Sequence, residues 1–176
     1  MTGEDDLEIL LTEQAVTQKI GELAAQISHD YAGKELLLIC ILKGAAIFTT
    51  DLARRLTIPA VLDFVQASSY GDGTVSSRTV AVRKDIEADI RGRHVLLVDG
   101  IIDTGETMDC LLKRFQERGP ASIKVAVLLD KPARRAVAVP VSYRGFEIPD
   151  RFVVGFGMDY GERYRNLPYI AVVKSS

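Results

Sequence analysis

The sequence predicts an α/β protein, one domain in which a twisted, mostly parallel sheet is flanked by helices. Apolar strand-like runs alternate along the chain with segments of helical periodicity, and this alternation favours parallel strands joined by helical crossovers. The runs are apolar throughout, which is typical of strands covered on both faces. The 176 residues suffice for one domain with a substantial core and are too few for two ordinary domains.

The first elements of this alternation come before residue 60. Thr12 is a suitable N-cap, and apolar residues recur at helical spacing from there to about Tyr31, with Gly33 ending the helix. Leu36–Leu42 (LLLICIL) is a short apolar run that predicts a strand buried on both faces. A second helix is expected near Ala45–Leu56.

The middle of the chain contains two expected strands, Val61–Ala67 and Thr79–Arg83. Between them lies Ser68–Ser77 (SSYGDGTVSS), which is small, polar and rich in glycine. A loop of this length inside a compact domain is usually functional or disordered. We therefore expect a mobile functional loop at about residues 68–78.

The second half of the chain continues the pattern. Val95–Val98 and Ile123–Leu129 are expected to be buried strands, with a helix at Thr107–Arg118 between them. Beyond Pro132 the chain is expected to be strand and loop, and Phe146–Met158 and Tyr169–Val173 close the domain.

Composition and charge argue against several function classes. The formal net charge of −2 provides no basic footprint for nucleic acid. The longest apolar runs are too short to span a bilayer, and the acidic, polar segment Met1–Glu8 does not resemble a signal peptide. These observations predict a cytoplasmic protein with neither nucleic-acid nor membrane partners.

Cysteine and histidine are scarce. Cys40 and Cys110 lie in apolar patterns and are expected to be buried, reduced thiols, whereas His29 and His94 are expected at the surface. A Ser-His-Asp triad or a zinc site of histidine and cysteine is therefore not expected. Acid–base chemistry must rely on carboxylates or lysines.

Polar residues follow the predicted strands at three places: Lys43-Gly44, Asp99–Thr107 and Asp130-Lys131. Ligands of parallel α/β sheets bind outside the carboxyl ends of the strands, so these three loops are expected to meet at one crevice. The segment Asp103-Thr104-Gly105-Glu106-Thr107 follows a strand and opens a helix, whose unpaired N–H groups suit a phosphate. A simple capped helix start is the alternative interpretation.

The strand ending in Asp99, followed by Ile101-Ile102 and this loop, resembles the signature of the type I phosphoribosyltransferases, which bind phosphoribosyl pyrophosphate. Within that family the chain resembles the bacterial hypoxanthine-guanine phosphoribosyltransferases over nearly its whole length. The matching segments are LKG at 42–44, SSYG at 68–71, LLDKP at 128–132, GFEIPDRFVVG at 145–155, DY at 159–160 and YRNLPY at 164–169. The block from about 145 to 170 is the most specific, because in the family it belongs to the purine branch and builds a hood over the active site, with an N-terminal contribution.

The resemblance implies a reaction that joins N9 of hypoxanthine or guanine to the ribose of phosphoribosyl pyrophosphate, giving IMP or GMP and pyrophosphate, with Mg²⁺. It implies a phosphoribosyl site of Asp99, Asp103, Thr104, Gly105, Glu106 and Thr107, and a pyrophosphate site of Lys43, Gly44 and Arg165. Ser69 and Tyr70 match a lid that closes over the phosphates.

For the purine, the resemblance implies Asp103 as the general base and Lys131 as the donor to the exocyclic O6, a choice that disfavours adenine. It implies Phe152 stacked on the base, the backbone of Val153 reading its edge, and Asp159 near the 2-position. Asp99 and Asp159 are the implied magnesium ligands. Family members form dimers or tetramers, so a homodimer or homotetramer is expected.

Gly100 departs from the family pattern, in which two adjacent acids bind the ribose hydroxyls and support magnesium. Losing one charge-assisted hydrogen bond costs about 1.5–3 kcal/mol, or roughly ten- to a hundred-fold in affinity. Three outcomes stay open: compensation by water or another residue, an impaired enzyme, or a non-catalytic regulator that binds phosphoribosyl pyrophosphate. A xanthine-preferring transferase is a further alternative within the same chemistry.

Overall fold

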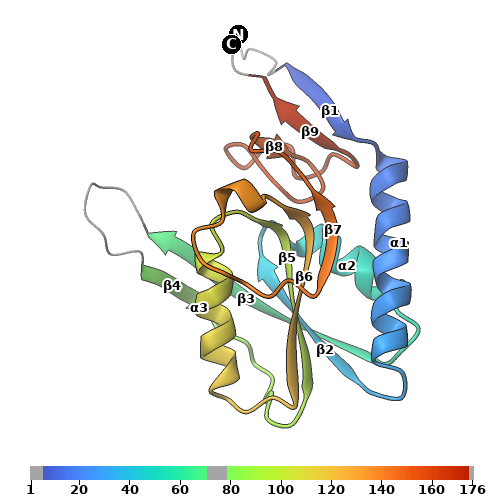
Figure 1. Ribbon diagram of the computed structural model, residues 1–176, viewed down its shortest axis with the longest axis vertical. Helices are drawn as coiled ribbons and strands as arrows, with labels where there is room; N and C mark the ends of the chain where they lie inside the picture. Colours follow the sequence, from blue (N-terminus) through green and yellow to red (C-terminus); the bar gives the residue numbers. More distant parts are fainter. Residues whose placement is uncertain (1–5, 71–78, 175–176) are drawn as a thin grey trace.

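The protein is described by a computed structural model over residues 6–70 and 79–174. In these ranges the strands form a six-stranded sheet of order β4-β3-β2-β5-β6-β7 and a three-stranded sheet of order β1-β9-β8 (Figure 1). Neighbours in the larger sheet are parallel, except that β3 and β4 pair antiparallel. The expected α/β fold with a mostly parallel sheet is confirmed.

The elements have the following bounds. The larger sheet comprises β2 (Leu36–Leu42), β3 (Ala60–Tyr70), β4 (Thr79–Lys84), β5 (His94–Ile102), β6 (Ser122–Asp130) and β7 (Tyr143–Glu147). The helices are α1 (Glu13–Asp30), α2 (Ala46–Ala53), α3 (Glu106–Gln116) and the short 3₁₀ helix η1 (Pro132–Arg134). The smaller sheet comprises β1 (Leu7–Leu11), β8 (Val153–Val154) and β9 (Ile170–Val173).

Strand β2 explains why the sheet has helices on both sides. Leu36 and Leu38 point into an apolar cluster shared with α1 and α2, whereas Leu37 and Ile39 point into a second cluster shared with α3. All four side chains are fully buried. Because successive residues of a strand face opposite sides, a continuous apolar run requires cover on both.

The helix limits follow local hydrogen bonding. The N–H of Ala15 donates to Thr12 Oγ1 at 3.2 Å, so the expected cap of α1 is confirmed. Helix α2 is shorter than the expected Ala45–Leu56. The N–H groups of Arg55 and Leu56 donate to carbonyls three residues back, which closes the helix with tight turns.

The smaller sheet, together with Phe152 and the segment that joins β8 to β9, is called the hood below, and it contains a strand that the sequence did not predict. Strand β1 pairs antiparallel with β9, from Leu7 opposite Val173 to Leu11 opposite Ile170. The segment contains Glu8 and has an irregular burial pattern, so its own residues carry a weak strand signal. Its conformation depends on a partner from the other end of the chain, as Figure 1 shows.

Strand β3 extends beyond the expected Val61–Ala67. The backbones of Ser69 and Tyr70 pair with Val80 and Thr79, so the expected loop at 68–78 begins later than its composition indicated. Cross-strand pairing gives these residues an extended backbone that polar composition does not signal. The remainder of the expected loop, 71–78, lies outside the described residues, as do the side chains of Ser69 and Tyr70.

The cysteines and histidines fit the expectations in part. Cys40 is buried and Cys110 half-buried, and both are free thiols. His29 is exposed. His94 is not a solvated surface residue, since a ring nitrogen lies 2.7 Å from Ser122 Oγ and the ring packs edge-on against Tyr31. Among the described residues, no helix is long and apolar enough to span a membrane.

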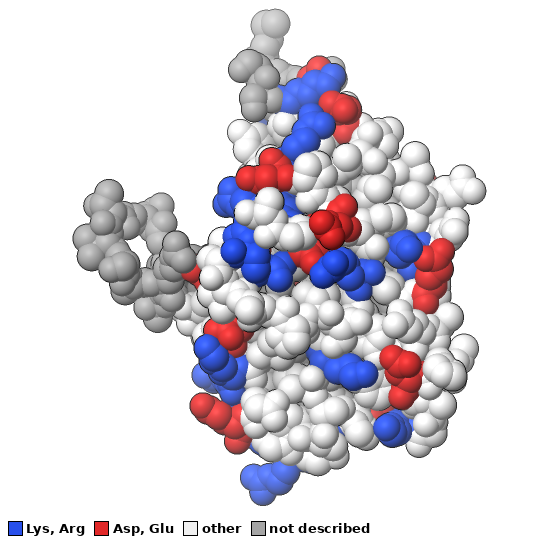
Figure 2. Space-filling model, in the orientation of Figure 1, with Lys and Arg blue, Asp and Glu red and all other residues white. Residues whose placement is uncertain are grey.

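Charge is spread over the surface rather than concentrated in one patch on the face seen in Figure 2, where basic and acidic side chains are interspersed. Charged side chains of the described residues form ion pairs across short distances, such as Arg93 with Glu35 at 2.7 Å. Exposed pairs of this kind add little to stability.

Candidate active site

Two cavities adjoin each other at the carboxyl ends of the strands. One has a volume of about 400 Å³ and the other of about 330 Å³. Ile101 and Asp103, which follow one another closely at the end of β5, line both of them. The expected convergence of the strand-end loops is confirmed, with Asp103 at the boundary between two compartments.

The larger cavity is formed by the end of β5 and the start of α3. Its lining includes Asp99, Asp103, Thr104, Gly105, Glu106 and Thr107, all predicted from the sequence, and Arg134, which was not. Unpaired N–H groups at a helix N-terminus attract anions. Arg134 adds a cation and pairs with Asp150 at 3.6 Å. This compartment is suited to a phosphate group.

Gly105 lines this cavity and packs closely against the segment after η1. It has φ +86°, and a Cβ there would lie 2.7 Å from the carbonyl oxygen of Val137. The carbonyl of Thr104 accepts hydrogen bonds from Ala136 and Val137, at 2.9 and 3.0 Å. Glycine is therefore required by the left-handed backbone and by packing against the segment after η1.

Asp99 lies on the wall of the same cavity. Its Oδ1 accepts a hydrogen bond of 2.7 Å from the N–H of Gly100. Burial raises the pKa of Asp99 to about 7, and repulsion from Asp103 adds to this rise, although the N–H groups of Gly100 and Ile101 oppose it. A cation or sugar hydroxyl bound here would favour the ionised form.

Gly100 is buried beside the turn that contains Lys43 and Gly44. A Cβ at position 100 would lie 2.9 Å from the Gly44 carbonyl oxygen and 3.3 Å from its carbonyl carbon. Gly157 approaches the same carbonyl from another side, where an added Cβ would lie 2.2 Å away. The space that a side chain at position 100 would need is therefore partly filled by the carbonyl of Gly44, which packs between Gly100 and Gly157.

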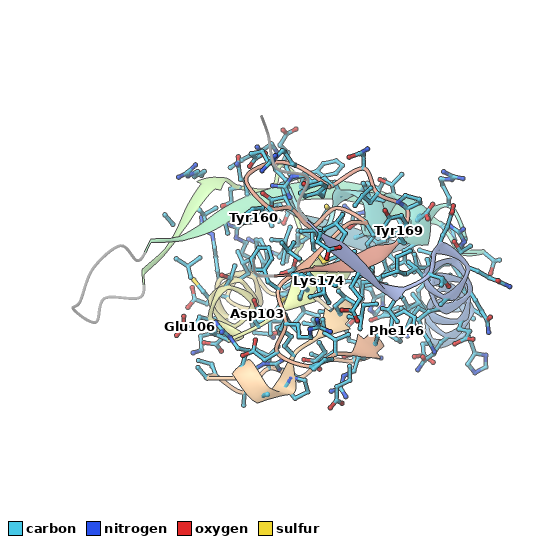
Figure 3. All side chains as sticks on the ribbon, turned by 90° about the horizontal axis from the view of Figure 1, so that it is seen from above. Asp103, Glu106, Phe146, Tyr160, Tyr169 and Lys174 are labelled. Carbon is cyan, nitrogen blue, oxygen red and sulfur yellow. The ribbon has the colours of Figure 1, made fainter. Side chains whose placement is uncertain are left out.

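The smaller cavity lies between this turn and the hood. Its lining comprises Lys43, Gly44, Ile101, Asp103, Lys131, Phe152, Val153, Met158, Asp159 and Arg165. All but Ile101 and Met158 were predicted as site residues. Figure 3 looks down onto this end of the molecule, with Asp103 beside the start of α3 and Tyr160 across from it on the hood side.

Lys131 is buried and its Nζ lies 3.4 Å from Asp103 Oδ1. A buried lysine needs a partner to stay charged, and this carboxylate provides one. Asp103 Oδ1 has no hydrogen-bond partner in the described structure. The contact with Lys131 is an ion pair without hydrogen-bond geometry, so this oxygen keeps the capacity to accept a hydrogen bond from a ligand.

A buried carboxylate that the sequence interpretation missed supports this pair. Asp130 is 1% exposed and binds Arg135 through Oδ1 and Arg144 through Oδ2, the latter at 2.8 Å. Arg135 Nε also donates to the carbonyl of Asp103 at 3.1 Å. Asp130 thus links the strand carrying Lys131 to the loop carrying Asp103. The signal in the sequence that could have indicated its role was its position directly before Lys131, with Arg134 and Arg135 shortly after it.

Phe152 is 54% exposed at the opening of the smaller cavity, so it is not a core residue. Its ring packs edge-on against Tyr160, with centroids 5.6 Å apart. Val153 follows it in β8 and is buried. An exposed aromatic face next to a fixed strand can stack on a planar base.

The cations of this cavity share carboxylates. Arg165 contacts Asp159 at 3.0 Å and Glu162 at 3.2 Å, and it donates to the carbonyl of Gly157 at 2.7 Å. Lys43 contacts Glu162 at 2.9 Å. These hydrogen bonds, first from Lys43 and then from Arg165, lower the pKa of Glu162.

The two implied metal ligands do not form one preformed metal site. Asp99 lines the larger cavity and Asp159 the smaller one. Among the described residues, no group of three or more His, Cys, Asp or Glu side chains could hold a metal ion. Mg²⁺ typically binds through one or two carboxylates together with substrate phosphates and water, so single carboxylates beside anion cavities fit that ion.

A mostly parallel sheet with a helix start suited to phosphate at its strand ends, and an exposed aromatic ring lining the same cavity as a lysine–aspartate pair, are features expected of a phosphoribosyltransferase. Residues 6–161 match the family model described as the phosphoribosyl transferase domain. The chain belongs to this family, and the resemblance seen in the sequence is confirmed.

Its relatives are enzymes of purine metabolism by name. The chain is 45% identical to a hypoxanthine-guanine phosphoribosyltransferase of Streptococcus pneumoniae, over 99% of this chain and 97% of the relative. It is 44% identical to the hypoxanthine phosphoribosyltransferase of Salmonella typhimurium, over 95% of each. A solved hypoxanthine-guanine phosphoribosyltransferase of Bacillus anthracis has a TM-score of 0.92 and 43% identity, covering 97% of this chain and 100% of the other.

Proposed function

We propose that the protein is a purine-salvage enzyme of the cytoplasm that transfers the 5-phosphoribosyl group of phosphoribosyl pyrophosphate to hypoxanthine and guanine. The observation that carries this proposal is the meeting of Asp103 and Lys131, 3.4 Å apart, at the boundary of the two cavities. A base in the smaller cavity and a phosphorylated sugar in the larger one would meet at this boundary.

In the proposed reaction, N9 of the base bonds to C1 of the ribose, the bond from C1 to pyrophosphate breaks, and the proton on N7 passes to Asp103. The 5′-phosphate would bind the start of α3, and pyrophosphate would bind Lys43, the Gly44 backbone and Arg165. Fixed donors at the departing charge lower the barrier to such a step. The Oδ1 of Asp103 accepts no hydrogen bond in the described structure, which supports its role as proton acceptor.

Mg²⁺ would be held by Asp99 on the ribose side and by Asp159 on the pyrophosphate side, where it would neutralise phosphate oxygens. Asp159 is already engaged by Arg165. Binding of the ion there would therefore require this ion pair to rearrange.

Base selection is proposed to rest on Lys131. Its ammonium group can only donate hydrogen bonds, so it can donate to the O6 of hypoxanthine or guanine, whereas the amino group of adenine would face it as a second donor. Xanthine differs from guanine only at the 2-position, which Val153 and Asp159 would face. A xanthine-preferring enzyme is therefore the second candidate.

Gly100 does not argue for a regulator without activity. The turn holding Lys43 and Gly44 packs into the space that a side chain at 100 would use. The chain also retains Asp103 and Lys131, which a protein that only senses phosphoribosyl pyrophosphate would not need. The ribose then depends on Asp99 and the start of α3.

The test is nucleotide formation from phosphoribosyl pyrophosphate and Mg²⁺ with hypoxanthine, guanine, xanthine and adenine as separate substrates. We expect turnover of the first two, little with adenine, and a fall in kcat of about 10²-fold or more in Asp103→Asn. The matched control is Asp109→Asn, since Asp109 lies on α3, the helix that follows Asp103, and is paired with Lys113 at 2.7 Å. Preference for xanthine would support the second candidate, and turnover of adenine at the rate of hypoxanthine would exclude the role of Lys131.

We further propose a homodimer or homotetramer. Val61, Leu62 and Phe64 on β3 and Ile47 on α2 are large apolar residues with at least a third of their surface exposed. Large apolar side chains exposed to solvent favour association. Light scattering of the purified chain would give the number of subunits.

A further inference from the structure

Glu162 is a carboxylate of the hood that the proposed chemistry leaves without a role. Its Oε2 lies 2.9 Å from Lys43 Nζ and its Oε1 lies 3.2 Å from Arg165 Nη2. Each oxygen thus binds one of the two cations assigned to pyrophosphate. The two cations come from the turn after β2 and from the hood, so Glu162 spans the proposed pyrophosphate site.

The backbone holds Glu162 in this position. It has φ +66°, which is unusual for a residue other than glycine. Its N–H donates to Asp159 Oδ2 at 2.8 Å, and the flanking residues Tyr160 and Arg163 exchange two backbone hydrogen bonds of 3.1 Å. The tight turn therefore fixes the start of the side chain, while the carboxylate itself stays exposed.

Glu162 is not needed for packing. Its side chain is 66% exposed, and the side chain of Lys43 is 56% exposed. Exposed ion pairs are weak and are broken easily by a better ligand. A carboxylate bound to two ligand-binding cations at an open cavity is thus a competitor for them rather than a structural support.

We infer that Glu162 acts as an internal counter-ion of the pyrophosphate site, occupying Lys43 and Arg165 when no diphosphate is bound and opposing the retention of pyrophosphate after transfer. The inference rests on the proposed function, because it takes these two cations as the pyrophosphate ligands. A diphosphate must displace the carboxylate to reach them, and the nearby negative charge then repels the bound anion. Both effects lower the affinity for pyrophosphate and for phosphoribosyl pyrophosphate.

The test is calorimetric titration of inorganic pyrophosphate, with Mg²⁺ present, into the wild-type chain and Glu162→Gln. Releasing Lys43 from an exposed ion pair and Arg165 from a partly buried one is expected to tighten binding about three- to tenfold. The gain should shrink as salt is raised from 50 to 500 mM or so, because screening weakens exposed charge interactions. The matched control is Glu22→Gln, which removes another exposed carboxylate, paired with Lys19 on α1, and should leave pyrophosphate affinity unchanged.

Unchanged affinity in Glu162→Gln would overturn the inference. Weaker binding would also overturn it, since it would mean that Glu162 orients Lys43 and Arg165 for the ligand. Lys43→Ala and Arg165→Ala separate this failure from failure of the proposed function. If neither alanine variant weakens pyrophosphate binding, the proposed site itself is wrong; if both weaken it and Glu162→Gln has no effect, only the inference fails.

Discussion

At the scale of single residues, Gly100 and Gly44 illustrate how an absent side chain can shape a site. The Gly44 carbonyl is packed where a side chain at position 100 would begin, 2.9 Å from the site of its Cβ. An acid at 100 would add a possible ribose ligand only if the turn moved. The binding free energy of about 1.5–3 kcal/mol that a carboxylate at position 100 would add for the ribose therefore does not apply to this backbone conformation.

We expect Gly100→Ala to lower the free energy of unfolding by about 1–3 kcal/mol, because overpacking against a backbone carbonyl cannot relax cheaply. It should also weaken pyrophosphate binding, since the Lys43–Gly44 turn has to shift. Urea denaturation and calorimetry would measure the two effects.

Gly21→Ala is the control for this substitution. Gly21 lies inside α1, where an added Cβ meets nothing within 4 Å, so alanine there should stabilise the protein by about 0.5–1 kcal/mol. If Gly100→Ala is as stable as the wild-type chain, the turn adapts freely to a side chain at position 100. An acidic residue could then be placed there without moving the turn at a cost in stability.

At the scale of elements, the ion pairs that matter most connect different helices and strands. Asp130 at the end of β6 binds Arg135 after η1 and Arg144 in β7. Asp85, directly after β4, binds Arg114 in α3 and Arg118 just beyond it. Asp130 thus fixes the end of β6, next to Lys131, to the elements beside it, and Asp85 fixes the end of the edge strand β4 to α3.

Asp85 leads to a prediction about pH. Burial opposes its ionisation, but hydrogen bonds from Arg118, Arg114 and the N–H of Ile86 outweigh this and lower the pKa from 3.8 to about 2. Because the pKa of Asp85 is lower in the folded state than in the unfolded state, the ionised carboxylate stabilises the fold. This stabilisation is complete above the unfolded-state pKa, near 4, and is lost as the pH falls towards 2. After allowance for solvent screening, the contribution is about 1–2 kcal/mol.

Asp85→Asn should therefore unfold more easily than the wild type by about 1–2 kcal/mol at pH 7, and the gap should close between pH 4 and 2 or so. Urea titrations at several pH values would measure it. Asp89→Asn serves as the control, because Asp89 is exposed and accepts one backbone hydrogen bond, from Arg91. A gap that persists unchanged at the lowest pH would contradict an ionic origin.

At the scale of the whole molecule, the hood and the larger sheet share one apolar cluster. Val153, Ile170 and Val172 of the hood belong to the same cluster as Leu36 and Leu96 of the sheet. Chains whose parts share a core unfold together. We therefore propose that residues 1–176 form a single folding domain.

Unfolding by urea should then show one transition, with the same midpoint by far-UV circular dichroism and by tyrosine fluorescence. Tyr160 and Tyr169 report on the hood and Tyr31 and Tyr143 on the core, since the chain lacks tryptophan. Two separated transitions would show that the hood folds independently and would contradict the proposal.

The sequence by itself determined the fold class and named most of the polar residues that line the two cavities. The run Leu36–Leu42 could only be a doubly covered strand, and Thr12 could be recognised as a cap, because both depend on local chemistry. The motifs around Asp103, Lys131 and Phe152 identified the family. The ends of β3, α2 and β5 could not be placed from sequence, since pairing and tight turns with distant or following residues decide them.

Only the tertiary structure decided which groups meet. The pairing of β1 with β9, the bridging of Lys43 and Arg165 by Glu162, and the support of Asp103 by Asp130 through Arg135 join residues that are far apart or carry no local signal. The contact of Gly100 with Gly44 is of the same kind. Periodicity and composition report each residue's own preference for burial or conformation, whereas contacts such as these depend on how the strand-end loops come together in space.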